Sequence, residues 1–460
     1  MNKIFKDKKV LIMGLGVFEK GRGVSALRFF YSQGAKITVT DLKTKEQLAS
    51  QLKRLKNLKG VKYVLGHHDK KDFFKTDIVI KNPGVRDDSE FLKIAKKRDL
   101  PIYNDVSLFA SLVDNPIIGI TGTRGKTTTT MLAFELLKSK YRDVRVGGNM
   151  KISPLSFIDQ LKVDAPVVLE LSSWMLQGFR DIKKSPVISV VTNIMRDHMN
   201  MYSSFDQYID DKFVIAKYQK PNDVLILNYE DKLAQKNYKK FKSTIYWVSN
   251  KKLPNNKTGL YSLKGWSWFV SSGKSIKILP IKSLKLVGQH NLYNVMSAVC
   301  LALISGVDLK SIRKIASEFK GVEYRLEVVK KIKGVTYIND TTATSPDATI
   351  AALKSMPKKP ILIFGGTDKV LDFKPMMDEV VKSAHKLIFL PGTATEKMRK
   401  ILGDRRGYFL VESMETAVKT AQGLAKNGDY ILLSPGAASF GLFKNEFDRG
   451  SKFNKVVKGL

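Results

Sequence analysis

The sequence predicts an α/β protein of three domains, each built on a mostly parallel sheet. Three observations support this prediction. Short apolar runs alternate with amphipathic segments of helical length along most of the chain. Turns that contain glycine follow several of these runs, as they do between strand and helix in parallel sheets. The chain has 460 residues, which suits a few domains of about 100–200 residues each.

The composition indicates sizeable cores and a strongly basic surface. The chain is 43% hydrophobic, and 79 Lys and Arg against 43 Asp and Glu give a net charge of +36. The lysines are spread through nearly every segment, which favours a solvated surface that attracts anionic ligands over one nucleic-acid-binding stripe. Cys300 is the only cysteine, which argues against a disulfide framework and is typical of a reducing cytosol. With no membrane-length apolar run and no signal peptide in the sequence, we expect a cytoplasmic monomer.

Residues 1–113 are predicted to form an N-terminal Rossmann-like domain. A strand, a helix and a second strand are expected at Val10–Met13, Gly23–Gln33 and Lys36–Thr40. Asp41 follows the second strand, at the place where an acid in such folds meets a ribose or a base. Glu19 stands where the dinucleotide fingerprint has its third glycine, which disfavours an NAD enzyme. The domain therefore predicts a nucleotide site of another kind.

A phosphate-binding loop is predicted near the start of a central P-loop ATPase-type domain, residues 114–307. Ile117–Ile120 reads as a buried strand, Thr121–Gly125 as a turn that contains glycine, and Lys126 as the start of a helix. The N–H groups of such a turn and the positive end of the helix attract phosphate oxygens. Lys126 can reach the outer phosphates, and the Thr127 hydroxyl can hold Mg²⁺. The motif is the short G-x-x-G-K-T rather than the longer P-loop motif.

Two later strands of this domain lead to side chains suited to a metal ion. Glu170 lies in the apolar strand Val167–Leu171, where a lone carboxylate is costly unless it is paired or binds a metal. Beside a phosphate loop we expect it to bind Mg²⁺. His198 comes soon after the strand Val187–Thr192 and is a second candidate. The tryptophan-bearing segment Ser243–Leu286 is predicted to be an antiparallel insert.

Residues 308–460 are predicted to form a C-terminal Rossmann-like domain. Strands are expected at Val335–Asn339, Pro360–Phe364, Lys386–Leu390 and Tyr430–Leu433. Motif-bearing turns follow three of them, at Asp340–Thr344, Gly365–Lys369 and Ser434–Ser439. Because ligands of open parallel sheets gather at the carboxyl ends of the strands, these turns are expected to form one site.

The motifs together resemble those of the Mur ligase family. They are, in order, Gly-Thr-x-Gly-Lys-Thr127, Glu170-Leu-Ser-Ser173, Asn193 with Asp197-His198, Gly288-Gln-His-Asn291 with Asn294, Arg325, Asn339-Asp340, and Ser434-Pro-Gly with Ser439, Asn445 and Arg449-Gly450. The likeness covers essentially the whole chain. It is greatest for the members that add D-glutamate to UDP-N-acetylmuramoyl-L-alanine in peptidoglycan synthesis. The family uses ATP and joins an amino acid to a carboxylate through an acyl phosphate.

The resemblance implies a role for each motif residue. ATP would be bound by Gly122, Thr123, Arg124, Gly125, Lys126, Thr127, Thr128, Asn291, Asn294, Arg325 and Asp340. Two Mg²⁺ ions would be held by Thr127, Glu170, His198 and Lys212, and the catalytic residues would be Lys126, His198 and Lys212. The nucleotide-sugar and D-glutamate would contact Leu15, Asp41, Asn149, Ser172, Thr344, Lys369, Ser439 and Phe440.

The resemblance also implies that Lys212 is carbamylated. The family carries a carbamate-bearing lysine on the helix after the metal histidine, and Lys212 has that place. A carbamate supplies the hard oxygen ligands that a second Mg²⁺ prefers, whereas an ammonium would repel the ion. Lys217 and Lys220 lie nearby, and Asp210 and Asp211 are rival oxygen donors.

Two alternatives remain open at this point. The chain could be a sibling ligase that adds L-alanine to UDP-N-acetylmuramate or recycles peptides, because the uridine-end loop Val17–Gly23 departs from the family pattern. It could also be a P-loop NTPase that uses its positive charge to bind nucleic acid. Arg124 and Thr342 are further departures, at places where Asn and Lys are common in the family.

Overall fold

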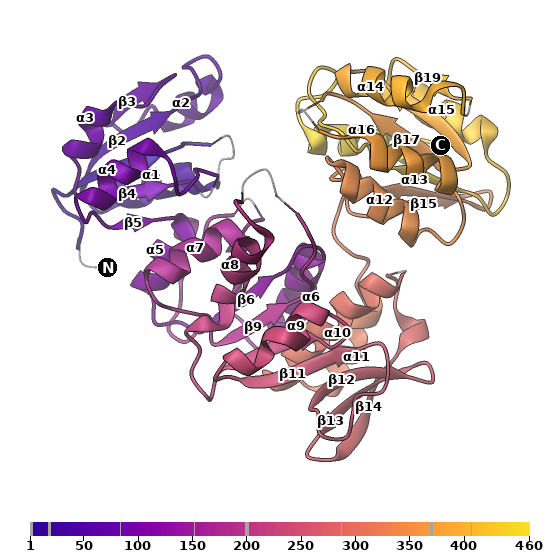
Figure 1. The fold of residues 1–460 in the computed structure, drawn as a ribbon, viewed down its shortest axis with the longest axis horizontal. Helices are drawn as coiled ribbons and strands as arrows, with labels where there is room; N and C mark the ends of the chain where they lie inside the picture. Colours follow the sequence, from indigo (N-terminus) through magenta and orange to yellow (C-terminus); the bar gives the residue numbers. More distant parts are fainter. Residues whose placement is uncertain are drawn as a thin grey trace. The chain divides into compact units, whose positions relative to one another are not determined.

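The computed structural model describes residues 3–16, 20–82, 84–150, 152–197, 202–286, 288–368, 371–405 and 407–460. The chain forms two compact units, Met1–Ser283 with Tyr293–Ala316 and Leu284–Leu292 with Ser317–Leu460. Within the described residues the strands form three sheets, two in the first unit and one in the second (Figure 1). The predicted α/β class is confirmed.

The N-terminal sheet is parallel throughout, in the order β3-β2-β1-β4-β5. Its strands are β1 (Lys9–Met13), β2 (Lys36–Asp41), β3 (Lys62–Leu65), β4 (Ile78–Lys81) and β5 (Ile102–Tyr103). The helices of this region are α1 (Arg22–Ser32), α2 (Ala49–Leu55), α3 (Lys70–Phe74), α4 (Glu90–Lys97) and α5 (Asp105–Leu112). The predicted strand–helix–strand unit at the start of the chain is therefore present, and β1 lies in the middle of the sheet.

The central sheet has the order β14-β13-β12-β11-β10-β9-β6-β8-β7 among the described residues. Its strands are β6 (Ile117–Thr121), β7 (Arg145–Gly148), β8 (Val167–Glu170), β9 (Ile188–Val191), β10 (Val224–Asn228), β11 (Thr244–Ser249), β12 (Gly259–Leu263), β13 (Trp266–Ser271) and β14 (Lys274–Pro280). The helices are α6 (Lys126–Lys138), α7 (Ser173–Asp181), α8 (Phe205–Lys217), α9 (Lys232–Asn237), α10 (Gln289–Ile304) and α11 (Leu309–Glu318).

The segment predicted as an antiparallel insert is only partly antiparallel. β12, β13 and β14 pair antiparallel, but β11 pairs parallel with both β10 and β12. The segment extends the central sheet and is not a separate layer. Trp247 on β11 is buried, which agrees with a core role for this tryptophan.

One large hydrophobic cluster of the first unit spans both of its sheets, and a smaller cluster covers the other face of β1 and β4. Buried residues of α1, α5, α7 and both sheets belong to the large cluster. Phe109 of α5 packs edge-to-face on Phe157, with ring centroids 5.9 Å apart. Asn104 caps α5 and donates to the carbonyl oxygen of Met175 on α7 at 3.0 Å. The N-terminal and central regions are therefore packed on each other.

The sheet of the second unit has the order β15-β16-β20-β17-β18-β19 in the described part of the chain. Its strands are β15 (Glu327–Ile332), β16 (Val335–Asn339), β17 (Ile361–Gly365), β18 (Lys386–Leu390), β19 (Phe409–Leu410) and β20 (Tyr430–Leu433), and its helices are α12 (Pro346–Ser355), α13 (Lys374–Ser383), α14 (Thr393–Leu402), α15 (Met414–Leu424) and α16 (Glu446–Lys458). Alternate residues of β17 enter two different hydrophobic clusters, Leu362 and Phe364 in one and Ile361 and Ile363 in the other. Since successive side chains of a strand point to opposite faces, helices cover both faces of this sheet.

Candidate active site

The phosphate loop connects β6 to α6, as the sequence predicts. Gly125 is the N-cap of α6 and has a left-handed φ of +82°. Gly122 has φ +148°, and a Cβ built there would lie 1.9 Å from the Thr192 side-chain oxygen. Both positions therefore require glycine for backbone conformation and for space, since a Cβ at Gly125 would also lie 2.1 Å from the Asn294 side-chain oxygen.

Gly122→Ala should lose ATP binding and unfold at a lower temperature, because the added methyl group would push the loop away from the end of β9. Gly423→Ala is the matched control. Gly423 lies within α15, and a Cβ there would meet no atom within 4 Å. Alanine favours a helix by about 1 kcal/mol over glycine, so this variant should be at least as stable as the parent. Thermal melting and titration with ATP test both expectations, and normal ATP binding by Gly122→Ala would contradict the first.

The end of β9 fixes the loop through its backbone. The Thr123 N–H donates to the Asn193 carbonyl oxygen at 2.8 Å, and the Arg124 N–H donates to the Asn193 side-chain oxygen at 2.9 Å. The Thr192 hydroxyl donates to the Arg124 carbonyl oxygen at 2.6 Å. The sequence motif includes Asn193 without a role for it, and the structure makes it the residue that holds the loop in shape.

Lys126 folds back over the loop. Its Nζ donates to the carbonyl oxygens of Gly122 and Thr123, both at 3.0 Å. Thr127 and Thr128 follow in the first turn of α6, with their N–H groups at the positive end of that helix. The ammonium, the helix terminus and the loop thus present positive charge in one place, as an anion site requires.

Lys212 reaches the same loop from α8. It is only 2% exposed, and its Nζ donates to the Gly122 carbonyl oxygen at 2.8 Å. The Tyr208 ring lies 4.7 Å from this nitrogen. Burial, together with the nearby charge of Lys126, lowers the pKa of Lys212 well below its usual value. Two lysine nitrogens therefore share one carbonyl group of the phosphate loop.

Glu170 is a buried carboxylate with one oxygen left without a protein partner. It is 1% exposed at the end of β8, which pairs with β6 next to the loop. Its Oε1 accepts from the Asn149 side chain at 2.9 Å, whereas its Oε2 is buried and makes no hydrogen bond. A buried carboxylate oxygen without a hydrogen bond is costly, and a Mg²⁺ ion bound beside the phosphate loop would compensate it, so this oxygen fits a Mg²⁺ ligand.

Asn149 connects Glu170 to the N-terminal region. Its side-chain oxygen accepts from the Arg22 guanidinium at 2.9 Å, while its amide donates to Glu170. Gly147 and Gly148 lie at the end of β7, and Asn149 follows directly. The nearby Ser172 hydroxyl accepts from the Met175 N–H at 3.3 Å and caps α7.

His198 and Lys369 lie outside the described residues, so their predicted roles stay predictions. Within the described part of the chain, no three His, Cys, Asp or Glu side chains gather as a metal site would require. Thr127, Glu170 and Lys212 are therefore the predicted metal ligands that the structure describes.

The predicted nucleotide-sugar turn after β1 is held by Asp41. The Leu15 N–H donates to one carboxylate oxygen of Asp41 at 2.8 Å, and the Lys43 N–H donates to the other at 2.9 Å. Leu15 is fully buried. In this structure Asp41 is thus a buried acceptor that fixes the shape of the turn.

Of the two asparagines predicted to bind ATP, Asn294 lies against the phosphate loop. Its side-chain oxygen would be 2.1 Å from a Cβ at Gly125, so it packs directly on that glycine. Asn291 lies one turn earlier on α10, in the part of the helix that groups with the second unit.

The three predicted turns of the C-terminal sheet do lie together, because β16, β20 and β17 are neighbours. The Ser434 hydroxyl donates to Asp340 at 2.9 Å, which joins the third turn to the first, and a bridge between Ala438 and Thr367 joins the third turn to the second. Asp340 also accepts from the Leu326 N–H at 3.2 Å, which brings the exposed Arg325 to the same edge.

The remaining predicted residues of this edge differ in exposure. Ser439 is buried, Thr344 is half-buried, and Phe440 is exposed. Arg449, fully buried, donates to both Thr341 and Ala437 and ties two of the turns together. The sequence motif includes Arg449, but it does not predict these hydrogen bonds between the turns.

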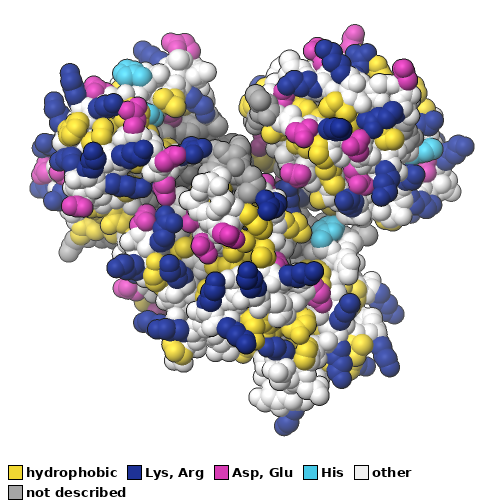
Figure 2. Space-filling model, in the orientation of Figure 1, with side chains coloured by type: hydrophobic (Ala, Val, Ile, Leu, Met, Phe, Trp, Pro, Cys, Tyr) yellow, Lys and Arg dark blue, Asp and Glu magenta, His cyan; other side chains and the backbone are white. Residues whose placement is uncertain are grey.

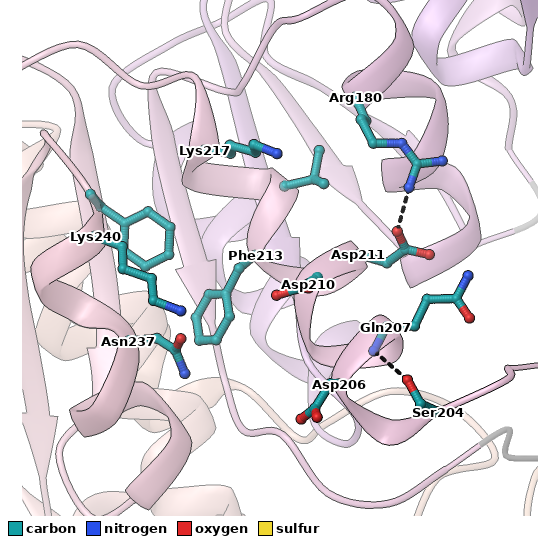
Figure 3. Close-up of a pocket in the computed structure, with 12 residues that line it drawn as sticks. Arg180, Ser204, Asp206, Gln207, Asp210, Asp211, Phe213, Lys217, Asn237 and Lys240 are labelled. Carbon is teal, nitrogen blue, oxygen red and sulfur yellow. Dashed lines mark hydrogen bonds and ion pairs between the residues drawn. The ribbon is translucent and has the colours of Figure 1, made fainter.

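A cavity of about 660 Å³ opens beside α8, away from the phosphate loop (Figure 3). Asp206, Asp210, Phe213 and Lys217 line it and share one face of the helix. Lys212 follows Asp210 by two positions, which places it on the opposite face. No described residue of the phosphate loop lines this cavity, so its size does not make it the candidate active site.

Comparison with known families gives three consecutive matches. The Mur ligase MurD-like N-terminal domain matches residues 8–104, the Mur ligase middle domain residues 120–302, and the Mur ligase glutamate ligase domain residues 324–436. The chain belongs to the Mur ligase family. All three sheets lie almost entirely within the matched ranges, which agrees with the three-domain prediction.

Relatives of known name match over nearly the full length. The UDP-N-acetylmuramoylalanine–D-glutamate ligase of Borreliella burgdorferi is 39% identical, over 99% of this chain and 98% of its own. Those of Roseiflexus sp. and Clostridioides difficile are 37% and 35% identical, with at least 98% of each chain covered.

Solved structures of this family share the fold. The UDP-N-acetylmuramate–alanine ligase MurC of Thermotoga maritima has a TM-score of 0.60 at 20% identity, over 98% of this chain and 99% of its own. MurF of the same organism, solved with ADP, has a TM-score of 0.58 at 17% identity, over 99% and 96%. At these identities the likeness concerns the fold alone.

Proposed function

We propose that this Mur ligase adds D-glutamate to UDP-N-acetylmuramoyl-L-alanine, with ATP as the energy source, in the synthesis of peptidoglycan precursors. The observation that carries the proposal is the convergence of Lys126, Lys212 and the orphaned Glu170 oxygen around one phosphate loop. The choice of substrates rests on the names of the full-length relatives. Each domain then has one task.

The residues around the phosphate loop would activate the substrate carboxylate. Transfer of the γ-phosphate to a carboxylate brings two anions together, so it requires positive charge that is already in place. Lys126 would release the two loop carbonyls that it now contacts and hold the outer phosphates instead. The backbone of the loop, shaped by Asn193, would hold the inner phosphates.

The donors present fit Mg²⁺ binding. Thr127 at the start of α6, the Glu170 oxygen without a partner, and the predicted ligands His198 and carbamylated Lys212 would hold two ions. Bound Mg²⁺ would neutralise charge on the phosphates and on the substrate carboxylate. We propose the carbamate because an ammonium at Lys212 would repel a cation beside Glu170.

The other two domains would hold the substrates. We propose an N-terminal domain of residues 1–113, where Leu15 and Asp41 shape the nucleotide-sugar turn and Asn149 lies beside it. We propose a C-terminal domain of residues 308–460, where Thr344, Lys369, Ser439 and Phe440 meet D-glutamate. The central domain of residues 114–307 would bind ATP. Asn291 and Asn294, together with Arg325 and Asp340 of the C-terminal domain, would contact the nucleoside of ATP. The acyl phosphate would be protected from water when the amino-acid domain covers it.

One assay tests the proposed function. Phosphate release from ATP should require both UDP-N-acetylmuramoyl-L-alanine and D-glutamate, and L-glutamate should not replace the D-isomer. If UDP-N-acetylmuramate and L-alanine stimulate release instead, the chain is the sibling ligase that adds the first amino acid. If no amino acid has an effect with either acceptor, the proposal is wrong.

The nucleic-acid alternative has less support from the surface. Lys and Arg side chains are scattered among acidic ones over the face shown in Figure 2, and no basic stripe is visible on that face. A salt-dependent mobility shift with DNA would favour the nucleic-acid alternative.

Within the described residues no helix is both long enough and apolar enough to span a membrane. We propose that the protein is a monomer and that it is cytoplasmic, and its single, buried cysteine, Cys300, is in keeping with this location.

A further inference from the structure

An ionic bridge connects the segment between β4 and α4, which packs on the nucleotide-sugar turn, to the helix that carries Lys212. Arg180 on α7 stands at its centre, with its guanidinium contacting one aspartate of each of two other segments and lying 3.8 Å from its own neighbour Asp181. One nitrogen lies 3.2 Å from Asp87, in the segment between β4 and α4. Another lies 3.0 Å from Asp211 on α8, and Figure 3 shows this contact. A guanidinium can bridge two carboxylates because its donors form a planar fork, which a single ammonium lacks.

Each end of the bridge is firmly seated. Asp87 also pairs with Lys81, a lysine that is only 2% exposed at the end of β4. The next residue, Asn82, donates its N–H to the Met13 carbonyl oxygen at 2.9 Å and packs its Cβ 3.0 Å from where a Cβ at Gly14 would lie. A shift of the nucleotide-sugar turn would therefore move Asn82, and with it Lys81, the preceding residue of the chain, which pairs with Asp87.

At the other end, Asp211 is held by two donors. Its second carboxylate oxygen accepts from Gln177 at 2.7 Å, and its side chain is 2% exposed. The next residue along α8 is Lys212, whose nitrogen contacts the Gly122 carbonyl of the phosphate loop. A small rotation of α8 that follows Asp211 would thus change the position of Lys212 at that loop.

We propose that Arg180 is a positioning residue that couples nucleotide-sugar binding to ATP binding. The inference rests on the proposed function, since it takes the turn after β1 as the nucleotide-sugar site. Binding there would set the position of Asp87, and Arg180 would transmit it to α8 and Lys212. The route is a continuous series of contacts within one compact unit, which is the physical requirement for such coupling. Its two ends are buried at Lys81 and Asp211, whereas Arg180 is 38% and Asp87 31% exposed.

The three bridge residues are not part of the family motifs used above. Arg180, Asp87 and Asp211 come from three segments and none of them lies in the phosphate loop or among the predicted substrate-binding residues. A substitution in the bridge is therefore expected to change the effect of one ligand on the affinity for the other, and to leave the affinity for each ligand alone nearly unchanged.

The test is calorimetric titration of the full chain with a non-hydrolysable ATP analogue and Mg²⁺, without and with saturating UDP-N-acetylmuramoyl-L-alanine. In the parent protein the nucleotide-sugar should tighten binding of the analogue by about fivefold or more. In Arg180→Met this ratio should fall close to one, while each ligand alone binds within about twofold of the parent. By linkage, the analogue must tighten the nucleotide-sugar by the same factor, which checks the measurement.

Two further variants separate positioning from structure. Arg180→Lys can contact one aspartate at a time and should keep only part of the coupling. Arg86→Met is the matched control, because Arg86 is exposed and pairs with Asp88 in the same segment at 2.8 Å without touching the bridge. It should leave the ratio unchanged.

Three results would overturn the inference. They are a parent ratio of one, an unchanged ratio in Arg180→Met, and an equal loss of affinity for both ligands separately in Arg180→Met, which would mark the residue as purely structural. Failure of the proposed function is distinguishable, because the parent would then not bind the nucleotide-sugar at all, and both proposals would fall.

Discussion

Lys126→Ala and Glu170→Ala should each lower turnover by about 10²–10³-fold or more, because each removes electrostatic stabilisation from phosphoryl transfer. The Lys126 ammonium lies on the phosphate loop at the start of α6, and Glu170 carries a buried oxygen that makes no hydrogen bond. The loss should appear in kcat, as expected for groups that act on the charge of the transition state. Steady-state phosphate release measures it.

Nucleotide-sugar binding should survive in both variants. The turn that holds Leu15 is fixed by Asp41 and contacts neither residue, and Asn149 keeps its bond to Arg22 when Glu170 is removed. Direct titration with the nucleotide-sugar measures this. A variant that loses both turnover and this binding would point to misfolding.

The same helix offers matched controls. Lys138 and Glu135 form an exposed pair on α6 at 3.1 Å, and an exposed pair of this kind contributes little to stability. Lys138→Ala and Glu135→Ala should therefore keep parental turnover. Near-parental turnover in Lys126→Ala or Glu170→Ala would remove that residue from the active site.

Local sequence patterns predicted much of this fold because they report local physics. The apolar runs around β1, β6, β8 and β17 fixed these strands to within a residue or two, since buried parallel strands are continuous apolar segments. The phosphate loop was predictable because glycine spacing and the lysine after it are dictated by backbone conformation. Glu170 was predictable because a lone acid in an apolar strand demands a partner.

The errors and omissions concern pairing between distant segments. Alternation of side chains indicates a strand but not the direction of its neighbour, so the parallel pairing of β11 with β10 and β12 was missed. β15 was not predicted, because Lys330 and Lys331 occupy consecutive positions of an exposed edge strand. The bridge from Asp87 to Arg180 spans 93 positions of the chain, and nothing in either segment specifies the other.

Lys212 shows how the two kinds of evidence combine. The sequence offers 79 Lys and Arg, and only its place in a family motif distinguishes Lys212 from Lys217. The structure separates them physically: Lys212 is 2% exposed and faces the phosphate loop, whereas Lys217 is exposed and lines the cavity on the other face of α8. Among the described residues no carboxylate forms a salt bridge with Lys212, and burying an ammonium without such a partner lowers the stability of the fold.

Carbamylation would remove that cost. Burial and the neighbouring Lys126 lower the pKa of Lys212, so its neutral amine is present at a lower pH than for an ordinary lysine. Only the neutral amine adds CO₂, and the product is an anion with two oxygens. These oxygens would be suitable ligands for a Mg²⁺ ion.

Lys212→Ala is therefore expected to lose most turnover, and formate, acetate or propionate should restore part of it by supplying the missing oxygens. Lys212→Met, which keeps the volume of the buried side chain, should lose turnover equally and controls for a cavity in the core. Lys217→Ala should be fully active and unaffected by the acids. In the parent, ¹³C-labelled bicarbonate should give a carbamate signal that is absent from Lys212→Met. Full activity of Lys212→Ala, or an active parent without the carbamate signal, would contradict the proposal, because the lysine would then act as an ammonium or not at all.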